Sequence, residues 1–182
     1  MIKTGIFLAR MQPVHKAHLY MVKQILKEND QVIIFLGSAN KSNSLRNPYN
    51  IKTRMNLLAK ALQEEFGEDY NKIKVYELPD WSYETDYEGQ IEWGNYLYYN
   101  IVSRIGKKNF SIYYSDEPEI MLNWFSNELK ERINFKFSER ANTFDGLSAT
   151  KVRNAIAHGD KNYIKKYCPS SVYENLEELS SI

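Results

Sequence analysis

The sequence predicts a doubly wound α/β fold, in which a mainly parallel sheet of about five strands is covered by helices on both faces. Short runs rich in Val, Ile, Phe and Tyr alternate along the chain with longer segments of helical periodicity. Polar residues gather directly after the predicted strands, where parallel sheets bind their ligands. The 182 residues can bury a sizeable core, and no linker or repeat divides them, so we expect one domain over 1–182.

The first part of the chain is typical of a strand, helix, strand, helix, strand unit. Residues 2–8 (IKTGIFL), 31–37 (QVIIFLG) and 72–79 (KIKVYELP) are short β-branched runs that predict buried strands. Between them, apolar residues recur at helical spacing over 16–29 and again over 51–67. Strands separated by helices of this length predict parallel pairing.

The second part continues the alternation. We expect a helix over 92–105, a strand over 110–115 (FSIYYS), a helix over 119–131 and a strand over 133–139. A C-terminal helical region follows from about residue 150. The whole pattern predicts a Rossmann-like architecture whose ligand lies beyond the carboxyl ends of the strands.

Composition limits the class of protein. The 24 basic and 23 acidic side chains nearly cancel, so overall charge gives no support for a nucleic-acid-binding protein, and any anion site must be local. The single cysteine, Cys168, cannot form an internal disulfide, which suits a reducing cytoplasm. No apolar run is long enough to span a bilayer. We therefore expect a cytoplasmic protein without a membrane or nucleic-acid partner.

Two histidines stand three residues apart at the start of the first predicted helix, so both could reach one ligand. The N-terminal end of a helix attracts anions, and imidazoles beside a phosphate can donate hydrogen bonds to it. His15 and His18 could also suggest zinc, but no third ligand follows at a recognisable spacing, and the neighbours Arg10 and Lys16 repel a cation. We favour phosphate and predict no metal held by protein ligands. An ordinary solvated helix cap is the alternative.

A second group of polar residues opens the C-terminal helical region. Ser148 is a good helix cap, Thr150 lies in the first turn, and the cations Lys151 and Arg153 follow at once. Cations at a helix N-terminus oppose the helix dipole unless a polyanion binds there. The alternative is a plain cap followed by solvated basic residues.

A third polar segment follows the second predicted strand. Gly37 and Ser38 are small enough for close backbone approach, and Asn47 with Pro48 predicts a turn into the helix that carries Arg54. A loop this polar is often only surface. Its position on a strand next to the first loop is what favours a binding role.

Three sequence blocks together resemble a known family. They are "GIFLARMQPVHKAH", "GSANKSNSLRNPYNIKTRM" and "GLSATKVRNAIAHGD". They are similar, in the same order, to G-R-F-Q-P-x-H-x-G-H, G-S-A-x-x-S-x-x-x-x-N-P-F-T-x-x-E-R-M and I-S-A-T-x-I-R. These motifs belong to the archaeal-type nicotinamide-nucleotide adenylyltransferases of the H-x-G-H nucleotidyltransferase superfamily. The resemblance covers most of the chain, and the long middle block sets this group apart from sister transferases.

The resemblance implies an activity and a set of ligands. It implies transfer of the adenylyl group of ATP to nicotinamide mononucleotide, giving NAD and pyrophosphate with Mg²⁺ as cofactor, by a homo-oligomer. The catalytic and ATP-binding roles that it implies fall on Arg10, His15, His18, Arg54, Ser148, Thr150 and Arg153.

The resemblance also implies a pocket for the nicotinamide nucleotide. It would include Ser38, Asn47 and Asp80, with Trp93 stacked on the pyridine ring and Trp81 as a rival for that place. For Trp93, the alternative is a core aromatic of the helix on which it lies.

The departures from the family motifs include Ala9, Met11, Ala17 and Thr53. Ala17 adds a methyl group where the motif has glycine, which predicts weaker nucleotide binding or a displaced loop. Two other classes of function stay open. One is a sister transferase that uses nicotinate mononucleotide, phosphopantetheine or an alcohol phosphate, and the other is a non-catalytic nucleotide-binding protein.

Overall fold

The computed structural model describes residues 1–81, 87–106, 109–115, 118–138 and 143–182. Its centre is a five-stranded sheet in the order β3-β2-β1-β4-β5, with every neighbouring pair parallel. The strands are β1 (Thr4–Ala9), β2 (Gln31–Gly37), β3 (Ile73–Leu78), β4 (Phe110–Tyr114) and β5 (Asn134–Phe137). The doubly wound fold predicted from the alternating pattern is confirmed.

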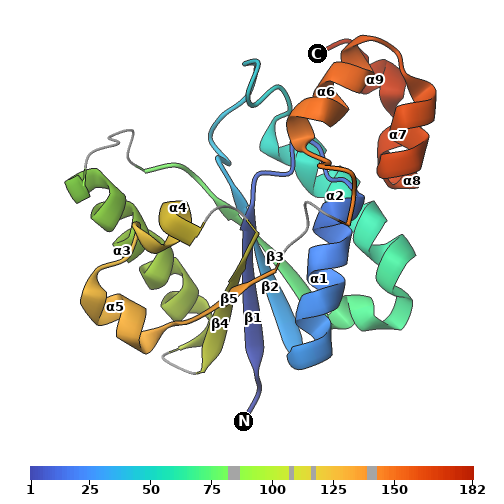
Figure 1. Cartoon of the computed structure of the whole chain (residues 1–182). Helices are drawn as coiled ribbons and strands as arrows, with labels where there is room; N and C mark the ends of the chain where they lie inside the picture. Colours follow the sequence, from blue (N-terminus) through green and yellow to red (C-terminus); the bar gives the residue numbers. More distant parts are fainter. Residues whose placement is uncertain (82–86, 107–108, 116–117, 139–142) are drawn as a thin grey trace.

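Helices cover both faces of this sheet (Figure 1). On one face lie α1 (Lys16–Glu28) and α2 (Ile51–Phe66), and on the other α3 (Tyr87–Ile105), α4 (Pro118–Leu122) and α5 (Asn127–Arg132). A short 3-10 helix, η1 (Gly67–Lys72), leads from α2 into β3. The C-terminal helices α6 (Ala149–Ala157), α7 (Lys161–Tyr167), α8 (Ser170–Tyr173) and α9 (Leu176–Ser180) gather beyond α1 and α2. Among the described residues, no helix is both long and apolar enough to cross a membrane.

The two faces of the sheet build two separate cores, because neighbouring strand residues point to opposite sides. Phe7 and Ile34 pack with α1, α2 and the C-terminal helices, whereas Ile6, Ile33 and Phe35 pack with α3 and the segment after β4. Residues of β2 are buried on both faces, as expected for a central parallel strand.

The strand order defines where a ligand can bind. From β1 the chain moves outward to β2 and β3, and it then returns to the other side of β1 with β4 and β5. The loops after β1 and β4 therefore leave the sheet in opposite directions, and the gap between them is the usual binding crevice of such sheets. The segments with functional residues must meet at this edge.

Two predicted elements differ in the structure. The helix predicted over 119–131 is broken into α4 and α5, because Ser126 caps a new helix by accepting a hydrogen bond from the Leu129 N–H group. The helix predicted to begin near residue 92 begins at Tyr87. Its first turn includes Gly89, which carries little helical signal.

The contact between α3 and the turn after α4 depends on a glycine. A Cβ atom at Gly94 would lie 1.6 Å from the carbonyl oxygen of Trp124. Only a residue without a side chain lets the helix approach this closely.

We expect Gly94→Ala to destabilise the protein by about 3 kcal/mol, since helix and turn would have to separate. Ser103→Ala, an exposed change on the same helix, should shift the unfolding free energy by less than about 0.5 kcal/mol. Urea unfolding measures both. Equal midpoints for Gly94→Ala and the wild type would contradict the close contact.

Candidate active site

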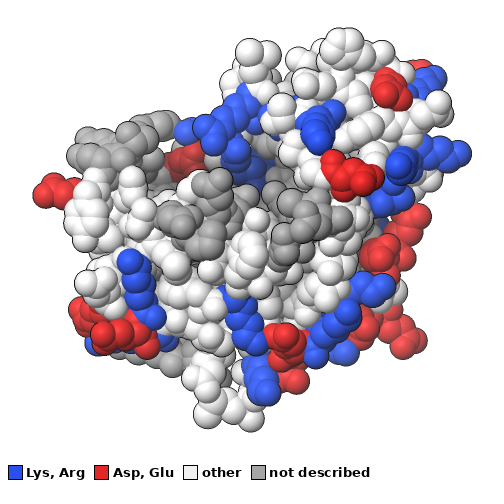
Figure 2. All heavy atoms as spheres, viewed as in Figure 1, with Lys and Arg blue, Asp and Glu red and all other residues white. Residues whose placement is uncertain are grey.

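The loops after β1 and β2 and the start of α6 meet at the carboxyl ends of the central strands. Hydrogen bonds join them directly: Arg54 binds the loops after β1 and β2, and Arg153 of α6 binds the loop after β1. Figure 2 shows Lys and Arg side chains gathered at this end of the molecule, over the loop after β2 and the start of the C-terminal helices. Because the charges of the whole chain nearly cancel, an anion site needs a local basic surface, and such a surface is present here.

The two histidines form a stacked pair at the start of α1. Their ring centroids lie 3.7 Å apart with 19° between the planes, and the rings are almost fully buried. His15 is the N-cap residue, and its backbone N–H group donates to Nδ1 of His18 over 3.2 Å. Because an accepting ring nitrogen carries no hydrogen, the His18 hydrogen is on Nε2, which makes that atom a donor. Two imidazolium charges this close would repel each other unless an anion lay beside them.

Arg153 lies on α6, one turn after the helix begins, and binds the loop that leads from β1 to the histidine pair. Its guanidinium donates to the backbone oxygen of Gln12 over 3.1 Å and to the hydroxyl of Thr150 over 3.1 Å. Partial burial lowers the pKa of Arg153, an effect that the nearby charge of Arg46 increases. The predicted cap is confirmed, since the Ser148 hydroxyl accepts from the Lys151 N–H group.

Arg54 lies beneath the loops and does not reach the surface. Its Nη1 donates to the backbone oxygens of Arg10 and Gly37 over 2.7 and 2.8 Å, and its Nη2 donates to Ser38 over 2.9 Å. The residue is 1% exposed. Burial lowers its pKa to about 10, and the charge of Arg10 adds to this, so the guanidinium stays charged at neutral pH. The sequence placed Arg54 among ATP-binding residues; in the structure its guanidinium ties two loops together, and its contact with ATP stays a prediction.

Residues predicted for the nicotinamide pocket link the loops after β2 and β3. The Ser38 hydroxyl donates to both carboxylate oxygens of Asp80, over 3.2 and 3.0 Å, and Lys41 forms an ion pair with the same carboxylate at 2.8 Å. The side-chain amide of Asn40 pairs with the backbone N–H and carbonyl groups of Asp80. Asn47 is 6% exposed, and its Oδ1 has no hydrogen-bond partner among the described residues. A buried oxygen in this state favours a donor supplied by a ligand.

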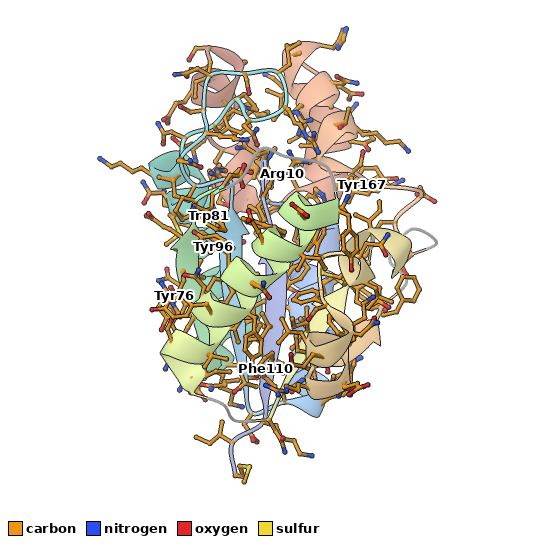
Figure 3. The ribbon with its side chains drawn as sticks, turned by 90° about the vertical axis from the view of Figure 1, so that its left-hand side faces the viewer. Arg10, Tyr76, Trp81, Tyr96, Phe110 and Tyr167 are labelled. Atoms are coloured by element: carbon orange, nitrogen blue, oxygen red, sulfur yellow. The ribbon has the colours of Figure 1, made fainter. Side chains whose placement is uncertain are left out.

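The two candidate tryptophans occupy different surroundings. Trp93 packs edge-on against Trp124, with ring centroids 6.1 Å apart, and contributes to the core beneath α3. Trp81 is 59% exposed and lies against Tyr96, with ring centroids 5.7 Å apart. Figure 3 shows Trp81 toward the end of the sheet where Arg10 lies, whereas Phe110 lies at the opposite end. Trp81 is therefore the more exposed of the two, whereas Trp93 is half-buried and packs against the core, and stacking on the pyridine ring stays a prediction for both.

The side chain of Ala17 lies in the protein core. Ala17 is fully buried within the core that α1 shares with the sheet, and Ala9 packs at the edge of the same core. This burial gives no support to crowding of a bound nucleotide by the methyl group, and the effect of Ala17 on nucleotide binding stays a prediction.

Sequence reasoning missed Gln12 and Asn40, whose side-chain amides pair with backbone groups of other loops. Neither belongs to a charged or nucleophilic residue type, so chemistry alone gave no signal for them. Within the described part of the chain, no group of three or more His, Cys, Asp or Glu residues could hold a metal ion.

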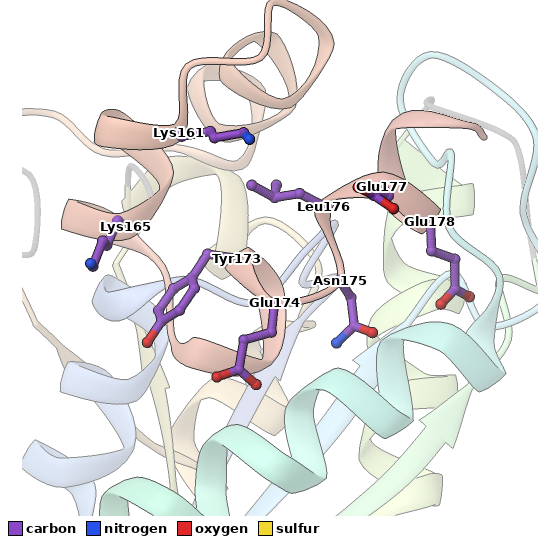
Figure 4. A pocket seen from close by; sticks show the side chains of 8 residues that line it. All are labelled: Lys161, Lys165, Tyr173, Glu174, Asn175, Leu176, Glu177 and Glu178. Carbon is purple, nitrogen blue, oxygen red and sulfur yellow. The ribbon is translucent and has the colours of Figure 1, made fainter.

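A separate hollow of about 520 Å³ lies among the C-terminal helices (Figure 4). Its lysines and glutamates nearly balance in charge, and its lining begins only at α7. None of the predicted site residues belongs to it. The residues that line it are Lys161, Lys165, Tyr173, Glu174, Asn175, Leu176, Glu177 and Glu178.

Comparison with known proteins places this chain in a family. A sequence model of the cytidylyltransferase-like family matches residues 6–165. A protein of Pyrobaculum arsenaticum named nicotinamide-nucleotide adenylyltransferase is 30% identical over 177 residues, which are 96% of this chain and 88% of that protein. The protein of the same name from Thermococcus kodakarensis is 28% identical over 183 residues, covering 100% of this chain and 86% of its own length.

Solved structures share the fold. A bifunctional NMN adenylyltransferase/ADP ribose pyrophosphatase from Francisella tularensis superposes with a TM-score of 0.75 at 19% identity, covering 100% of this chain. The chain spans about half of that protein, 51% of its length. A putative nicotinate-nucleotide adenylyltransferase from Vibrio parahaemolyticus superposes with a TM-score of 0.67 at 16% identity, covering 97% of this chain and 99% of its own.

The burial of Ala17 leads to a test with two readouts. Ala17→Gly should lower the free energy of unfolding by about 1 to 2 kcal/mol, through lost methyl burial and weaker helix propensity. Its dissociation constant for ATP, the ligand that the resemblance implies, should stay within about twofold of the wild type. Urea unfolding and calorimetric titration measure the two. Clearly tighter ATP binding by the glycine variant would show that the methyl group does crowd the nucleotide.

Proposed function

The chain belongs to the cytidylyltransferase-like family, and we propose that it transfers the adenylyl group of ATP to nicotinamide mononucleotide. Proteins named nicotinamide-nucleotide adenylyltransferase, which it matches over nearly its full length, support this proposal. The products are NAD and pyrophosphate. The observation that supports this proposal most directly is the stacked pair of His15 and His18 at the start of α1, together with Arg153 bound to the loop between β1 and that pair. Such a set of donors suits a triphosphate.

The phosphate-binding roles are assigned to side chains of the loop after β1, the start of α1 and the start of α6. Arg10, His15 and His18 hold the triphosphate from the β1 side, and Thr150 and Arg153 hold it from α6. Ser148 contributes by capping α6, so that the free N–H groups of its first turn are directed at the phosphates. Arg10, His15, His18 and Arg153 are the proposed catalytic residues.

The reaction needs positioning more than it needs a protein nucleophile. A phosphate oxygen of nicotinamide mononucleotide attacks the α-phosphorus of ATP, and the bond from that phosphorus to the bridging oxygen of pyrophosphate breaks. Both reactants are anions, so the protein must hold them in line and neutralise the charge that develops on the leaving oxygens. Positioning of this kind can supply about 7 to 11 kcal/mol of the barrier. The donor at Nε2 of His18 and the guanidinium of Arg153 are suited to the leaving pyrophosphate.

We propose that Mg²⁺ enters as part of the ATP substrate. The site described here is lined by cations and imidazoles, and the described residues provide no carboxylate cluster for a resident metal. Mg²⁺ commonly keeps its waters and binds through substrate phosphates. A related Francisella tularensis structure was solved with AMP and a Mn ion, which supports a divalent ion accompanying the nucleotide.

The nicotinamide nucleotide is assigned to the loops after β2 and β3. Ser38, Asn47 and Asp80 form its polar wall, and the unpartnered oxygen of Asn47 is an acceptor for one of its donors. For the pyridine ring, the exposed face of Trp81 is better placed than Trp93. Nicotinate mononucleotide is the second candidate acceptor, because the structurally similar protein from Vibrio parahaemolyticus is described as a putative nicotinate-nucleotide adenylyltransferase.

We further propose that residues 1–182 form one nucleotidyltransferase domain, that the protein acts in the cytoplasm, and that it assembles as a homo-oligomer. Its partners are then small nucleotides rather than nucleic acid or a membrane. The near balance of charge supports the first exclusion.

Incubating the purified protein with ATP, Mg²⁺ and one acceptor at a time tests the activity through release of pyrophosphate. We expect rapid release with nicotinamide mononucleotide, slower release with nicotinate mononucleotide, and none with phosphopantetheine or an alcohol phosphate. ATP binding without pyrophosphate from any acceptor would leave a nucleotide-binding protein as the function.

His18→Ala should lower kcat by about 100-fold, because it removes a donor to the phosphates. The free energy of unfolding should fall by about 2 kcal/mol, from the lost hydrogen bond to His15 and the lost packing of the buried ring, which leaves the variant folded in the assay. Lys23→Ala, an exposed change on α1, is the matched control and should affect neither. If the His18→Ala variant is largely unfolded under the assay conditions, unfolding alone explains the lost activity, and His18 is then structural.

A further inference from the structure

Gln12 is almost completely buried, yet it carries a polar side chain in the loop that holds Arg10 and His15. The residue is 1% exposed. Its Nε2 donates to the backbone oxygen of Tyr49 over 3.0 Å, and its Oε1 accepts from the Tyr49 N–H group over 3.0 Å. The side-chain amide therefore pairs with Tyr49 as a neighbouring strand would. This fixes the end of the loop after β2, one residue before the cap of α2.

The backbone of the same residue is tied to a third segment. The carbonyl oxygen of Gln12 accepts from Nη1 of Arg153, whose Nη2 holds the Thr150 hydroxyl. Gln12 thus connects the loop after β1 to both of the other segments that form the site. A shift of its carbonyl would move the guanidinium of Arg153.

Gln12 is not placed to contact a ligand itself. Both polar atoms of its side chain are already bound to Tyr49, and the residue is shielded from solvent. The chain just before it is held in an uncommon conformation, since Met11 has a φ of 50°. Such a conformation persists where surrounding contacts fix it, and Met11 is itself 2% exposed.

We propose that Gln12 is a positioning residue. Its side chain is anchored to the backbone of Tyr49, and this holds the Gln12 carbonyl oxygen in place, which in turn sets the position of Arg153 relative to the histidine pair. This inference rests on the proposed function, and it assigns to Gln12 no contact with substrate. Phosphoryl chemistry is sensitive to placement, since a shift of about 1 Å can cost on the order of 100-fold in rate.

The test replaces the donor of Gln12 while preserving its size. Gln12→Glu places a carboxylate oxygen against the Tyr49 carbonyl oxygen, so two acceptors face each other and the pairing is lost. We expect kcat with ATP and nicotinamide mononucleotide to fall by at least about tenfold at a temperature where the variant is fully folded. Gln63→Glu, the same change at an exposed position of α2, is the control and should retain wild-type kcat.

A double-mutant cycle separates positioning from general destabilisation. If Gln12 acts through Arg153, the loss caused by Gln12→Glu should shrink to less than about threefold in an Arg153→Ala background. The same tenfold loss in both backgrounds would overturn the inference. So would a folded Gln12→Glu variant with wild-type kcat and only a lower melting temperature.

If Gln12→Glu does not fold, Gln12→Asn takes its place in the same cycle, because it keeps both amide groups but is one methylene shorter. An equal loss of kcat in both backgrounds, or wild-type kcat with only a lower melting temperature, would again overturn the inference. Failure of the proposed function would show separately, as absence of pyrophosphate release by the wild type.

Discussion

The arrangement of the site depends on a buried positive charge, the guanidinium of Arg54, held by three backbone carbonyl oxygens. Burying a charge is costly unless it is well hydrogen-bonded, so these bonds stabilise the particular course of the loops that supplies the oxygens. The acceptors come from Arg10, Gly37 and Ser38, at the carboxyl ends of β1 and β2. One side chain of α2 thereby fixes where the first two loops leave the sheet.

The arginines of the site lie close enough for their like charges to repel one another. The charge of Arg10 adds to the burial that lowers the pKa of Arg54, and the charge of Arg46 does the same at Arg153. Like charges held together by a rigid scaffold are relieved when a polyanion binds, and they need little rearrangement when it does. The protein is therefore preorganised for phosphate groups, with Arg54 and Gln12 supporting the residues proposed to touch them.

Periodicity and turn residues predicted most of the fold, because a buried parallel sheet imposes strong patterns on its strands and helices. Periodicity missed the break between α4 and α5, where Ser126 caps a new helix and the turn before it packs on Gly94. In the site, the motifs located His15, His18 and Arg153 correctly at one edge of the sheet. The direction of a side chain cannot be read from such patterns. For that reason the sequence did not reveal that Arg54 ties two loops together or that the methyl group of Ala17 lies in the core.

The supporting role of Arg54 is best tested by a crystal structure with both substrates bound. The ligands would be nicotinamide mononucleotide and an ATP analogue that has a methylene bridge between its α- and β-phosphorus atoms. We expect Arg54 to keep its hydrogen bonds to the carbonyl oxygens of Arg10, Gly37 and Ser38, with the phosphates bound by the histidine pair and Arg153. An Arg54 side chain turned onto the phosphates, with those carbonyl oxygens released, would contradict it.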